Sequence, residues 1–199
     1  AYAFGGAEMA INTVQELLDI PIHHYVSINM KGLKDLIDAV GGIEVDNTIG
    51  EFTLDGITVP AGKIKLDGTT GLAYARMRHE DPEGDVGRQR RQREVLIELT
   101  NKILSFNSLL KYQEILDVIG EHGETDLSFD QMMAMLKKYT PALKTIETDQ
   151  LKGYDYTGDG VTGIEGISYQ LVEESERQRV ENAIKEQMNL STKDTEQSQ

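Results

Sequence analysis

The sequence predicts a globular protein of the α/β class. Amphipathic helical segments recur along the whole chain, short β-rich segments lie between them, and no linker or internal repeat separates the two kinds. The chain has 199 residues, of which 39% are hydrophobic and 27% are charged. This length and composition are sufficient for one substantial hydrophobic core.

Four elements are expected near the N-terminus. Apolar residues recur at helical spacing in two segments, and Pro21 closes the first while Gly41-Gly42 stops the second. Short β-rich runs follow each of these segments. The expected elements are a helix over Ala7–Asp19, a strand over His24–Ile28, a helix over Met30–Val40 and a strand that begins with Ile43–Val45.

Turn and capping residues define the next part of the chain. Asp55-Gly56 is a turn signal between two short β segments within Phe52–Val59. Asp67 can cap a short helix that runs to Tyr74. A long helix is expected over Val86–Ser105.

The remaining segments complete one predicted domain over residues 1–188. The expected elements are helices over Ser108–Ile119, Ser128–Lys138 and Glu173–Met188, strands over Lys144–Leu151 and Ile167–Leu171, and a glycine-rich loop over Tyr154–Gly166. Residues 189–199 are polar and are expected to form a disordered tail.

The overall charge excludes some classes of function. The chain carries 34 acidic and 20 basic residues, and its net charge of -14 argues against general nucleic-acid binding, which favours broad basic surfaces. It has no cysteine, which excludes disulfides and cysteine-ligated metals. No apolar run has the length of a membrane span. The chain starts at Ala1 and not at Met, so we expect a fragment.

Against this acidic background, six of the eight arginines lie between Arg76 and Arg93. A guanidinium group offers a planar fork of donors that matches phosphate and carboxylate oxygens. A local cluster of such groups in an acidic protein suits a small, highly charged anion. This segment is therefore the candidate functional site.

The helix expected from Val86 separates its arginines into two faces. One face aligns two arginines and a glutamine with two apolar residues: Arg88, Arg91, Gln92, Val95 and Leu99. The opposite face carries Arg90 and Arg93, and Arg90 is expected to pair with Glu94. A half-buried guanidinium needs a counter-charge, and cations are unfavourable at a helix N-terminus, so a bound phosphate is the expected compensation.

Residues before this helix complete the candidate site. Arg76 and Arg78 alternate with Met77, so both point to one side of an extended segment. Asp85 is a candidate N-cap, a group that orients an arginine, or a general base. The alternative is a solvated helix face whose arginines pair with nearby carboxylates, and the residues leave both interpretations open. Those carboxylates are Glu80, Asp81, Glu83 and Asp85.

Several motifs, taken in order, resemble the LytR-CpsA-Psr family. The arginine signature consists of Tyr74–Arg78, Gly84–Arg88 and Arg91-Gln92. Supporting stretches surround it: Tyr25–Ile28, Ile37–Val45, Pro60–Gly62, Leu66–Gly68 and Ala73-Tyr74. The resemblance extends from Ala1 to about Leu171.

The resemblance implies an α/β/α sandwich with a central mixed sheet and a hydrophobic pocket for a lipid. It implies an enzyme that transfers an anionic glycopolymer, of the wall teichoic acid or capsule type, from an undecaprenyl pyrophosphate carrier to peptidoglycan, forming a phosphodiester. Such proteins are anchored in the cytoplasmic membrane of Gram-positive bacteria, with the catalytic domain on the cell-wall side. The family's N-terminal third, with its membrane helix and the carboxylates that hold Mg2+, is expected to be missing from this chain.

The resemblance also implies roles for single residues. Arg76, Arg78, Arg88 and Gln92 match phosphate-contacting positions, and Arg91 matches a basic position beside them. Asp85 and Arg88 are the candidate catalytic residues. The candidates for the lipid pocket are apolar residues of three expected helices, each of which is also a candidate for plain core: Val14, Leu17, Leu18, Leu33, Ile37, Val95 and Leu99.

Two other functions remain open at this point. The chain can be a non-catalytic module that binds polyprenyl phosphate or a wall polymer. It can also be a transcriptional attenuator, although the net charge and the lack of a basic groove argue against a nucleic-acid partner.

Overall fold

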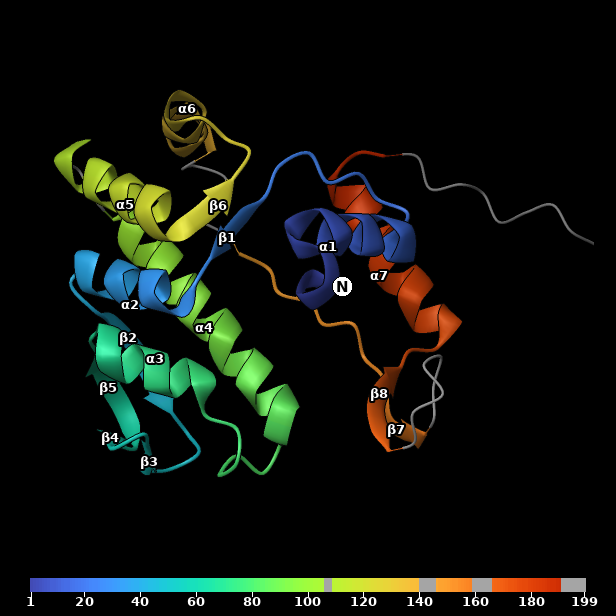
Figure 1. Cartoon of the computed structure of the whole chain (residues 1–199), viewed down its shortest axis with the longest axis horizontal. Helices are drawn as coiled ribbons and strands as arrows, with labels where there is room; N and C mark the ends of the chain where they lie inside the picture. Colours follow the sequence, from blue (N-terminus) through green and yellow to red (C-terminus); the bar gives the residue numbers. More distant parts are fainter. Residues whose placement is uncertain (106–108, 140–145, 159–165, 191–199) are drawn as a thin grey trace, which may run out of the picture. The chain divides into compact units, whose positions relative to one another are not determined.

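The computed structural model describes residues 1–105, 109–139, 146–158 and 166–190. The chain divides into two compact units, whose elements are labelled in Figure 1. The central unit spans His24–Ile146, and the terminal unit combines Ala1–His23 with Glu147–Gln199. Helices and strands occur in both units, which confirms the predicted α/β class. A single domain over residues 1–188 stays a prediction.

The central unit contains most of the described elements. They are β1 (Val26–Ile28), α2 (Met30–Ala39), β2 (Ile43–Asn47), β3 (Phe52–Leu54), β4 (Ile57–Val59), β5 (Gly62–Leu66), α3 (Gly68–Arg76), α4 (Gly84–Leu104), α5 (Leu109–His122), β6 (Gly123–Thr125) and α6 (Phe129–Tyr139). The expected helices and strands of this segment are present with small shifts at their ends, and β5 and β6 are additional.

The described strands of this unit form antiparallel pairs. β1 pairs with β6, β2 with β5, and β3 with β4. The described residues therefore do not form the expected central mixed sheet. The physical reason is local: β2 to β5 follow one another through short turns, and such turns favour antiparallel neighbours.

The β2–β5 pair shows how alternation builds the core. Ile43 and Val45 are buried, and Glu44 and Asp46 beside them are exposed. The register places Ile43 opposite Leu66. Because successive side chains point to opposite faces of a strand, one face of the pair supplies apolar groups to the core.

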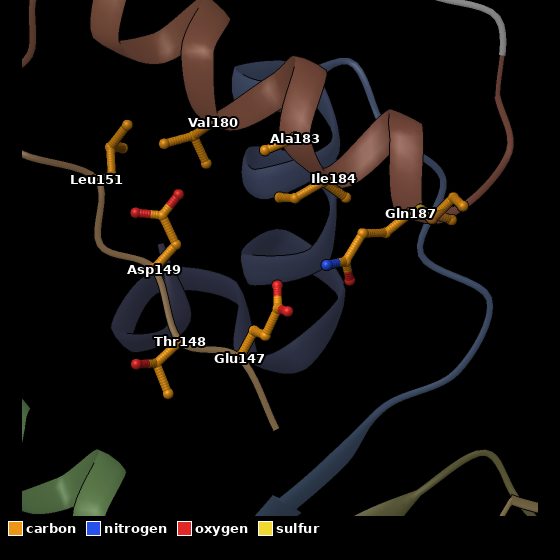
Figure 2. Close-up of a pocket in the computed structure, with 9 residues that line it drawn as sticks. Glu147, Thr148, Asp149, Leu151, Val180, Ala183, Ile184 and Gln187 are labelled. Carbon is orange, nitrogen blue, oxygen red and sulfur yellow. The ribbon is translucent and has the colours of Figure 1, made fainter. Parts of the chain in front are cut away.

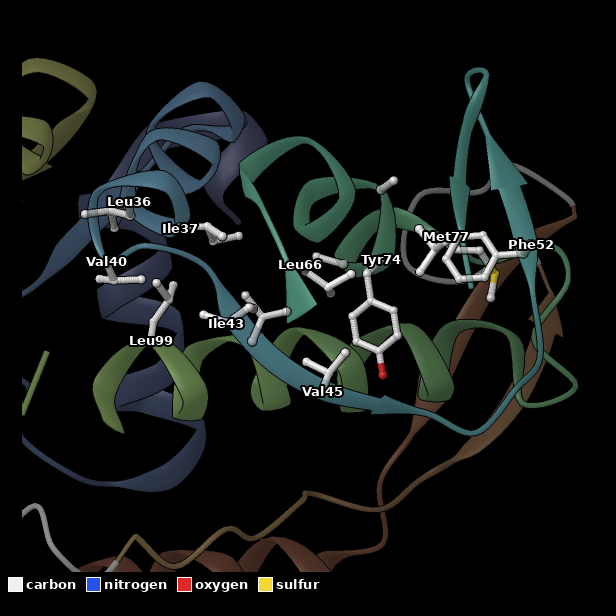
Figure 3. Close-up of a cluster of buried hydrophobic side chains, with 14 of the residues drawn as sticks. Leu36, Ile37, Val40, Ile43, Val45, Phe52, Leu66, Tyr74, Met77 and Leu99 are labelled. Carbon is white, nitrogen blue, oxygen red and sulfur yellow. The ribbon is translucent and has the colours of Figure 1, made fainter. Parts of the chain in front are cut away.

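The core of the central unit lies between this strand pair and helices α2, α3 and α4 (Figure 3). Val95 and Leu99 of α4 are 1% and 4% exposed, which confirms that this face of the helix points inward. The other buried members are Leu36, Ile37, Val40, Ile43, Val45, Phe52, Val59, Leu66, Ala73, Tyr74, Ala75, Met77 and Ile115.

Two aspartates fix the start of α3. Asp67 is the N-cap: its carboxylate accepts a hydrogen bond from the Thr70 N–H at 2.8 Å, and the Thr70 hydroxyl accepts one from the Asp67 N–H at 3.0 Å. Asp38 of α2 accepts from the Gly68 N–H at 2.7 Å. An added Cβ at Gly68 would lie 2.2 Å from the carbonyl oxygen of Lys34, so only glycine allows this approach. The predicted cap is confirmed, and α3 is held against α2.

The terminal unit contains α1 (Tyr2–Leu18), β7 (Tyr154–Gly158), β8 (Ile167–Leu171) and α7 (Glu174–Gln187). α1 begins earlier than expected and is interrupted at Gly5 and Gly6, whose backbone angles are not helical. β7 and β8 are antiparallel partners. Within the described residues, no helix has both the length and the apolar character needed to cross a membrane.

Two expectations for the terminal part of the chain are corrected. A strand is expected over Lys144–Leu151, but residues 146–151 contain none. Tyr154–Gly158 is expected to be loop and instead forms β7, because its tyrosines and threonine favour a pleated strand once β8 is available as partner. The rest of the expected loop, residues 159–165, and residues 191–199 of the expected tail lie outside the described residues.

Candidate anion-binding site

The arginine-rich segment lies where α3 ends and α4 begins. Met77 is the C-cap of α3, and only 2% of its surface is exposed, so it anchors this junction in the core. Arg76 and Arg78 flank it, with side chains 47% and 56% exposed. The alternation around Met77 therefore leaves both guanidinium groups at the surface.

Asp85 is the carboxylate that two of the arginines share. Its Oδ1 lies 2.6 Å from Arg88 Nη2 and 3.7 Å from Arg78 Nε. Its Oδ2 accepts a hydrogen bond from Gln89 Nε2 at 2.9 Å. Asp85 is not the N-cap, because Glu83 holds that position without a side-chain cap. In the first turn of α4 its negative charge is favourable.

The guanidinium group of Arg76 has a separate partner. Arg76 Nη1 lies 3.0 Å from Asp55 Oδ2. Asp55 and Gly56 form the turn between β3 and β4, with φ values of 51° and 80°. This left-handed geometry is that of a two-residue hairpin turn, which confirms the predicted Asp-Gly turn. The hairpin thus brings a carboxylate to the C-terminal end of α3.

We call Arg76, Arg78 and Arg88 the arginine cluster. Within the part of the chain that the structure describes, its three guanidinium groups have two carboxylate partners, Asp55 and Asp85. The five side chains are between 36% and 65% exposed. Arg88 Nε is buried and has no hydrogen-bond partner among the described residues. Three guanidinium groups carry more N–H donors than two carboxylates can accept, so the exposed part of the cluster retains donors that an anion from solution can use.

Arg91 lies on the same face of α4 but has an internal role. Its side chain is 2% exposed, and its guanidinium pairs with the fully buried carboxylate of Asp81. It also donates to the carbonyl oxygens of Tyr74, at 3.0 Å, and Met77. Burial raises the pKa of Asp81, but the Glu83 N–H and the Arg91 guanidinium outweigh burial and hold that pKa below its ordinary value. The expected phosphate contact of Arg91 is therefore corrected: its donors are committed inside the protein.

Arg90 and Glu94 do not form the expected pair. Arg90 pairs with Glu83, which precedes α4. Glu94 instead accepts hydrogen bonds from the Tyr74 hydroxyl, at 2.7 Å, and from the Asp46 N–H, at 3.3 Å. Burial and the hydrogen bond to Glu94 raise the pKa of Tyr74. Glu94 thus serves the packing of α4 on α3 and β2.

Two further residues of α4 line the junction. Gln92 is half-buried, and its Nε2 lies 3.4 Å from the carbonyl oxygen of Ala75. Gly87 faces Asp81 so closely that an added Cβ would lie 1.8 Å from Asp81 Oδ2. The absence of a side chain at Gly87 is therefore what allows the Asp81 carboxylate to reach Arg91.

The candidate lipid-pocket residues of the central unit are core residues. Ile37, Val95 and Leu99 are 0%, 1% and 4% exposed. Leu33 is partly buried against the same core. Helical spacing predicts that a residue points inward but does not distinguish close packing from the wall of a pocket, so contact with a lipid stays a prediction.

The other candidates lie in the terminal unit. Val14 and Leu17 of α1 are 39% and 42% exposed, and Leu18 is buried. This unit has a cavity of about 520 Å³ beside α7, shown in Figure 2. Val180 and Ile184 contribute to its apolar wall, and none of the lipid-pocket candidates lines it.

The described carboxylates do not fit a magnesium site. Among the described residues, no group of three or more histidine, aspartate or glutamate side chains is placed to hold a metal ion. Asp55, Asp81 and Asp85 are each paired with a guanidinium group. Mg2+ prefers several oxygen ligands and water, which these paired carboxylates do not offer together.

Asp81 and Gly87 organise the site, and sequence reasoning did not single them out. The sequence places Asp81 only among several surface carboxylates. The available signal was Arg91, which shares a face with Val95 and Leu99: a guanidinium in that position requires a buried counter-charge, and the preceding loop is the nearest source.

The chain is similar to known proteins over nearly all of its length. The model of the LytR_cpsA_psr family matches residues 1–186. A polyisoprenyl-teichoic acid–peptidoglycan teichoic acid transferase, TagU of Enterococcus faecalis, is 51% identical over 189 residues, which are 95% of this chain and 60% of that protein. This chain therefore spans about 60% of the length of that relative.

Solved structures extend the likeness to the fold. A crystal structure of a transcriptional regulator from Enterococcus faecalis has 64% identity and a TM-score of 0.85, and the match covers 96% of this chain and 69% of that one. A structure of TagT bound to LIIa-WTA has 27% identity and a TM-score of 0.77, covering 96% and 71%. By sequence and by fold, the chain belongs to the LytR_cpsA_psr family.

Proposed function

We propose that this chain carries the phosphate-binding part of an enzyme that transfers an anionic glycopolymer from an undecaprenyl pyrophosphate carrier to peptidoglycan. The product is a phosphodiester. The observation that carries the proposal is the arginine cluster, in which three half-exposed guanidinium groups share two carboxylates within a chain of net charge -14. The names of similar proteins support it, since one is a teichoic acid transferase and another was solved with LIIa-WTA.

The arrangement suits phosphoryl transfer. In such reactions the protein mainly positions the reacting groups and stabilises charge on the phosphate oxygens. Arg78 and Arg88 already converge on one anionic group, the Asp85 carboxylate. A diphosphate presents more oxygens and more charge than a carboxylate, and it can engage the same donors together with Arg76.

Within this proposal, Asp85 orients the arginines. One of its oxygens faces Arg88 and Arg78, and the other accepts from Gln89. A carboxylate with both oxygens engaged is placed to hold guanidinium groups. Acceptance of a proton from the attacking sugar hydroxyl is the second role, and it requires that ligand binding first releases an oxygen from Arg88.

The wider setting of the enzyme is part of the proposal. A membrane anchor would hold it at the outer face of the cytoplasmic membrane of a Gram-positive bacterium, facing the wall. The relative from Enterococcus faecalis is consistent with such an envelope role. An apolar slot would bind the polyprenyl tail. Carboxylates outside the described residues would hold Mg2+.

The test is the binding of farnesyl pyrophosphate, a water-soluble polyprenyl pyrophosphate, by isothermal titration calorimetry. We expect the wild-type chain to bind and Arg78→Ala to bind roughly tenfold or more weakly, because one charge-assisted hydrogen bond is lost. Arg90→Ala is the matched control. Arg90 lies on α4, in the same arginine-rich segment of the chain, and its side chain is 48% exposed, but its partner is Glu83.

Two results would count against the proposal. One is a wild-type chain that does not bind farnesyl pyrophosphate. The other is an equal loss of affinity in Arg78→Ala and Arg90→Ala, which would indicate general charge attraction and no defined site.

The second candidate function is binding of the lipid pyrophosphate without transfer of the glycopolymer. It is considered because the chain spans only about 60% of the length of its TagU relative. A transfer assay with a protein of that relative's full length separates the two functions. If the longer protein transfers the glycopolymer and this chain binds only the lipid pyrophosphate, the phosphate-binding site lies in this chain. The other groups that transfer requires then lie in the additional residues of the longer protein. A gel-shift assay with DNA tests the attenuator alternative, for which we expect no retardation.

A further inference from the structure

The junction of α3 and α4 contains a buried ion pair that the proposed chemistry does not use directly. The side chains of Asp81 and Arg91 are 0% and 2% exposed. A buried ion pair is costly to desolvate and often stabilises a protein no better than apolar residues of similar size. The contacts of this pair point to a different role, because they engage the backbone of Arg78 and of residues on either side of Arg76.

Arg91 connects α4 to the last turn of α3. Its guanidinium donates to the carbonyl oxygens of Tyr74 and Met77, the residues that lie on either side of the segment carrying Arg76. The planar fork of donors fixes both distance and orientation between the two helices. The backbone on which Arg76 and Arg78 are carried is thereby fixed relative to α4.

Asp81 connects the loop to the start of α4. Its N–H donates to the carbonyl oxygen of Arg78 at 3.4 Å, and its own carbonyl accepts from the Gly84 N–H at 2.9 Å. Its carboxylate accepts from the Glu83 N–H at 2.8 Å and pairs with Arg91. One residue therefore joins the backbone of Arg78 to the first turn of the helix that carries Asp85 and Arg88.

We propose that Asp81 and Arg91 are positioning residues, which hold Arg78 and Arg88 at the separation that a diphosphate group requires. The inference rests on the proposed function, since it assigns the anion to the arginine cluster. Neither residue touches the anion. Their effect is geometric, because a charge-assisted hydrogen bond weakens steeply when donor and acceptor are displaced or misaligned.

The first experiment removes both charges together. The double variant Asp81→Leu/Arg91→Met replaces the pair with apolar side chains, so we expect it to fold with a Tm close to that of the wild type. We expect its Kd for farnesyl pyrophosphate to rise at least roughly tenfold. The control is Val59→Ala, a fully buried core site in β4, which should lower Tm and leave Kd unchanged. Wild-type affinity in the folded double variant would overturn the inference.

A second variant decides the matter if the double variant does not fold. Arg91→Lys keeps the charge opposite Asp81 but loses the fork that spans two carbonyl groups. We expect its effect on Kd to be much smaller in an Arg78→Ala background than in the wild type, because part of that effect acts through Arg78. Fully additive effects of the two substitutions would mean that Arg91 acts independently of the cluster, and would overturn the inference.

A readout without ligand separates this inference from the proposed function. The Nε–H resonances of Arg78 and Arg88 in 1H–15N spectra report their surroundings in the free chain. We expect both to shift in Arg91→Lys and not in Val59→Ala. Unchanged resonances reject the positioning role even if the wild type binds the pyrophosphate. Shifted resonances in a chain that binds no pyrophosphate support the positioning role and reject the proposed function.

Discussion

Two arginine-bearing regions of the molecule differ in how their charge is balanced. On α7 each arginine contacts two carboxylates: Arg177 contacts Glu174 and Glu181, and Arg179 contacts Glu176 and Asp149. In the arginine cluster, three guanidinium groups share the carboxylates of Asp55 and Asp85. The α7 region therefore has an excess of acidic partners, and the arginine cluster has an excess of basic groups.

The difference separates structural arginines from arginines available to a ligand. Arg177 also donates to the carbonyl oxygen of Leu17 at 2.9 Å, and Arg179 donates to that of Gln150 at 3.2 Å. These contacts tie α7 to other segments of the terminal unit and leave little for an external anion. A dense run of arginines is thus weak support for a site until the partners of each guanidinium are counted.

The largest expected effect concerns Arg91, whose guanidinium group is buried and paired inside the protein. Asp81→Asn leaves the Arg91 charge buried without a counter-ion, and we expect a loss of roughly 3–5 kcal/mol in the free energy of unfolding. Urea unfolding followed by circular dichroism measures it. Arg179→Ala, which breaks a solvent-exposed pair on α7, should cost far less. Equal losses in the two variants would remove the distinction between buried and exposed pairs.

The second prediction compares the two regions in a measurement of ligand binding. Arg88→Ala should weaken the binding of farnesyl pyrophosphate by roughly tenfold to a hundredfold, since a charge-assisted hydrogen bond contributes about 1.5–3 kcal/mol. Arg179→Ala carries the same change in net charge and should leave the Kd unchanged. If both variants lose affinity alike, the pyrophosphate responds to overall charge and the arginine cluster is not its site.

The third prediction concerns the contribution of the α7 ion pairs to the pH dependence of stability. Hydrogen bonds from Arg179 lower the pKa of Glu176 and of Asp149 to about 2, from ordinary values of 4.5 and 3.8. Because these folded-state pKa values are depressed, their contribution to stability is present above about pH 4.5 and is lost as pH falls toward 2. Arg179→Ala should therefore show a smaller decrease in Tm between neutral pH and pH 2 than the wild type.

Thermal unfolding over that pH range checks the third prediction, and Arg88→Ala serves as control because it leaves the α7 pairs intact. A pH profile of Tm that is the same in Arg179→Ala and wild type would show that these pairs do not contribute to the acid sensitivity.

The smallest effect is expected where both partners are solvated. Arg76 and Asp55 have side chains 47% and 65% exposed. Arg76→Ala should change the free energy of unfolding by only about 0–1 kcal/mol, as is usual for surface pairs. Chemical denaturation gives the value. A loss as large as that of Asp81→Asn would mean that the β3–β4 hairpin depends on Arg76, and that this arginine is structural.

Several elements could be predicted from the sequence because each is specified by residues that are close together in the chain. The cap at Asp67, the Asp55-Gly56 turn and the long helix through Val95 and Leu99 each depend on residues close together in the chain. The strand β7 was not predicted, because Tyr154–Gly158 becomes a strand only by pairing with β8. No local sequence signal indicates that pairing. Among the described residues the strands form antiparallel pairs and not the expected central mixed sheet, because short turns join β2 to β5.

The candidate site was predictable in part. Spacing indicated that Arg76 and Arg78 share a surface and that Arg91 lies in line with buried residues. The half-buried guanidinium led to the expectation of a phosphate, but Asp81 already supplies the anion for Arg91. The pairing with carboxylates that the alternative predicted is present for Arg88 with Asp85, Arg90 with Glu83 and Arg91 with Asp81, but the pair of Arg91 is buried and not solvated. Periodicity cannot assign such partners, because it gives the direction of a side chain and not its neighbour.

Gly87 has a consequence for anyone who engineers a more heat-resistant form of this protein. Replacing a helical glycine with alanine commonly gains up to about 1 kcal/mol from intrinsic helix propensity. Gly120 of α5 suits that strategy, since an added methyl group there meets nothing within 4 Å. The same substitution at Gly87 would drive a methyl group into the Asp81 carboxylate. A rule based on helix propensity alone would treat the two glycines as equivalent. At Gly87 the substitution would displace the Asp81 carboxylate, which pairs with Arg91 beside the arginine cluster.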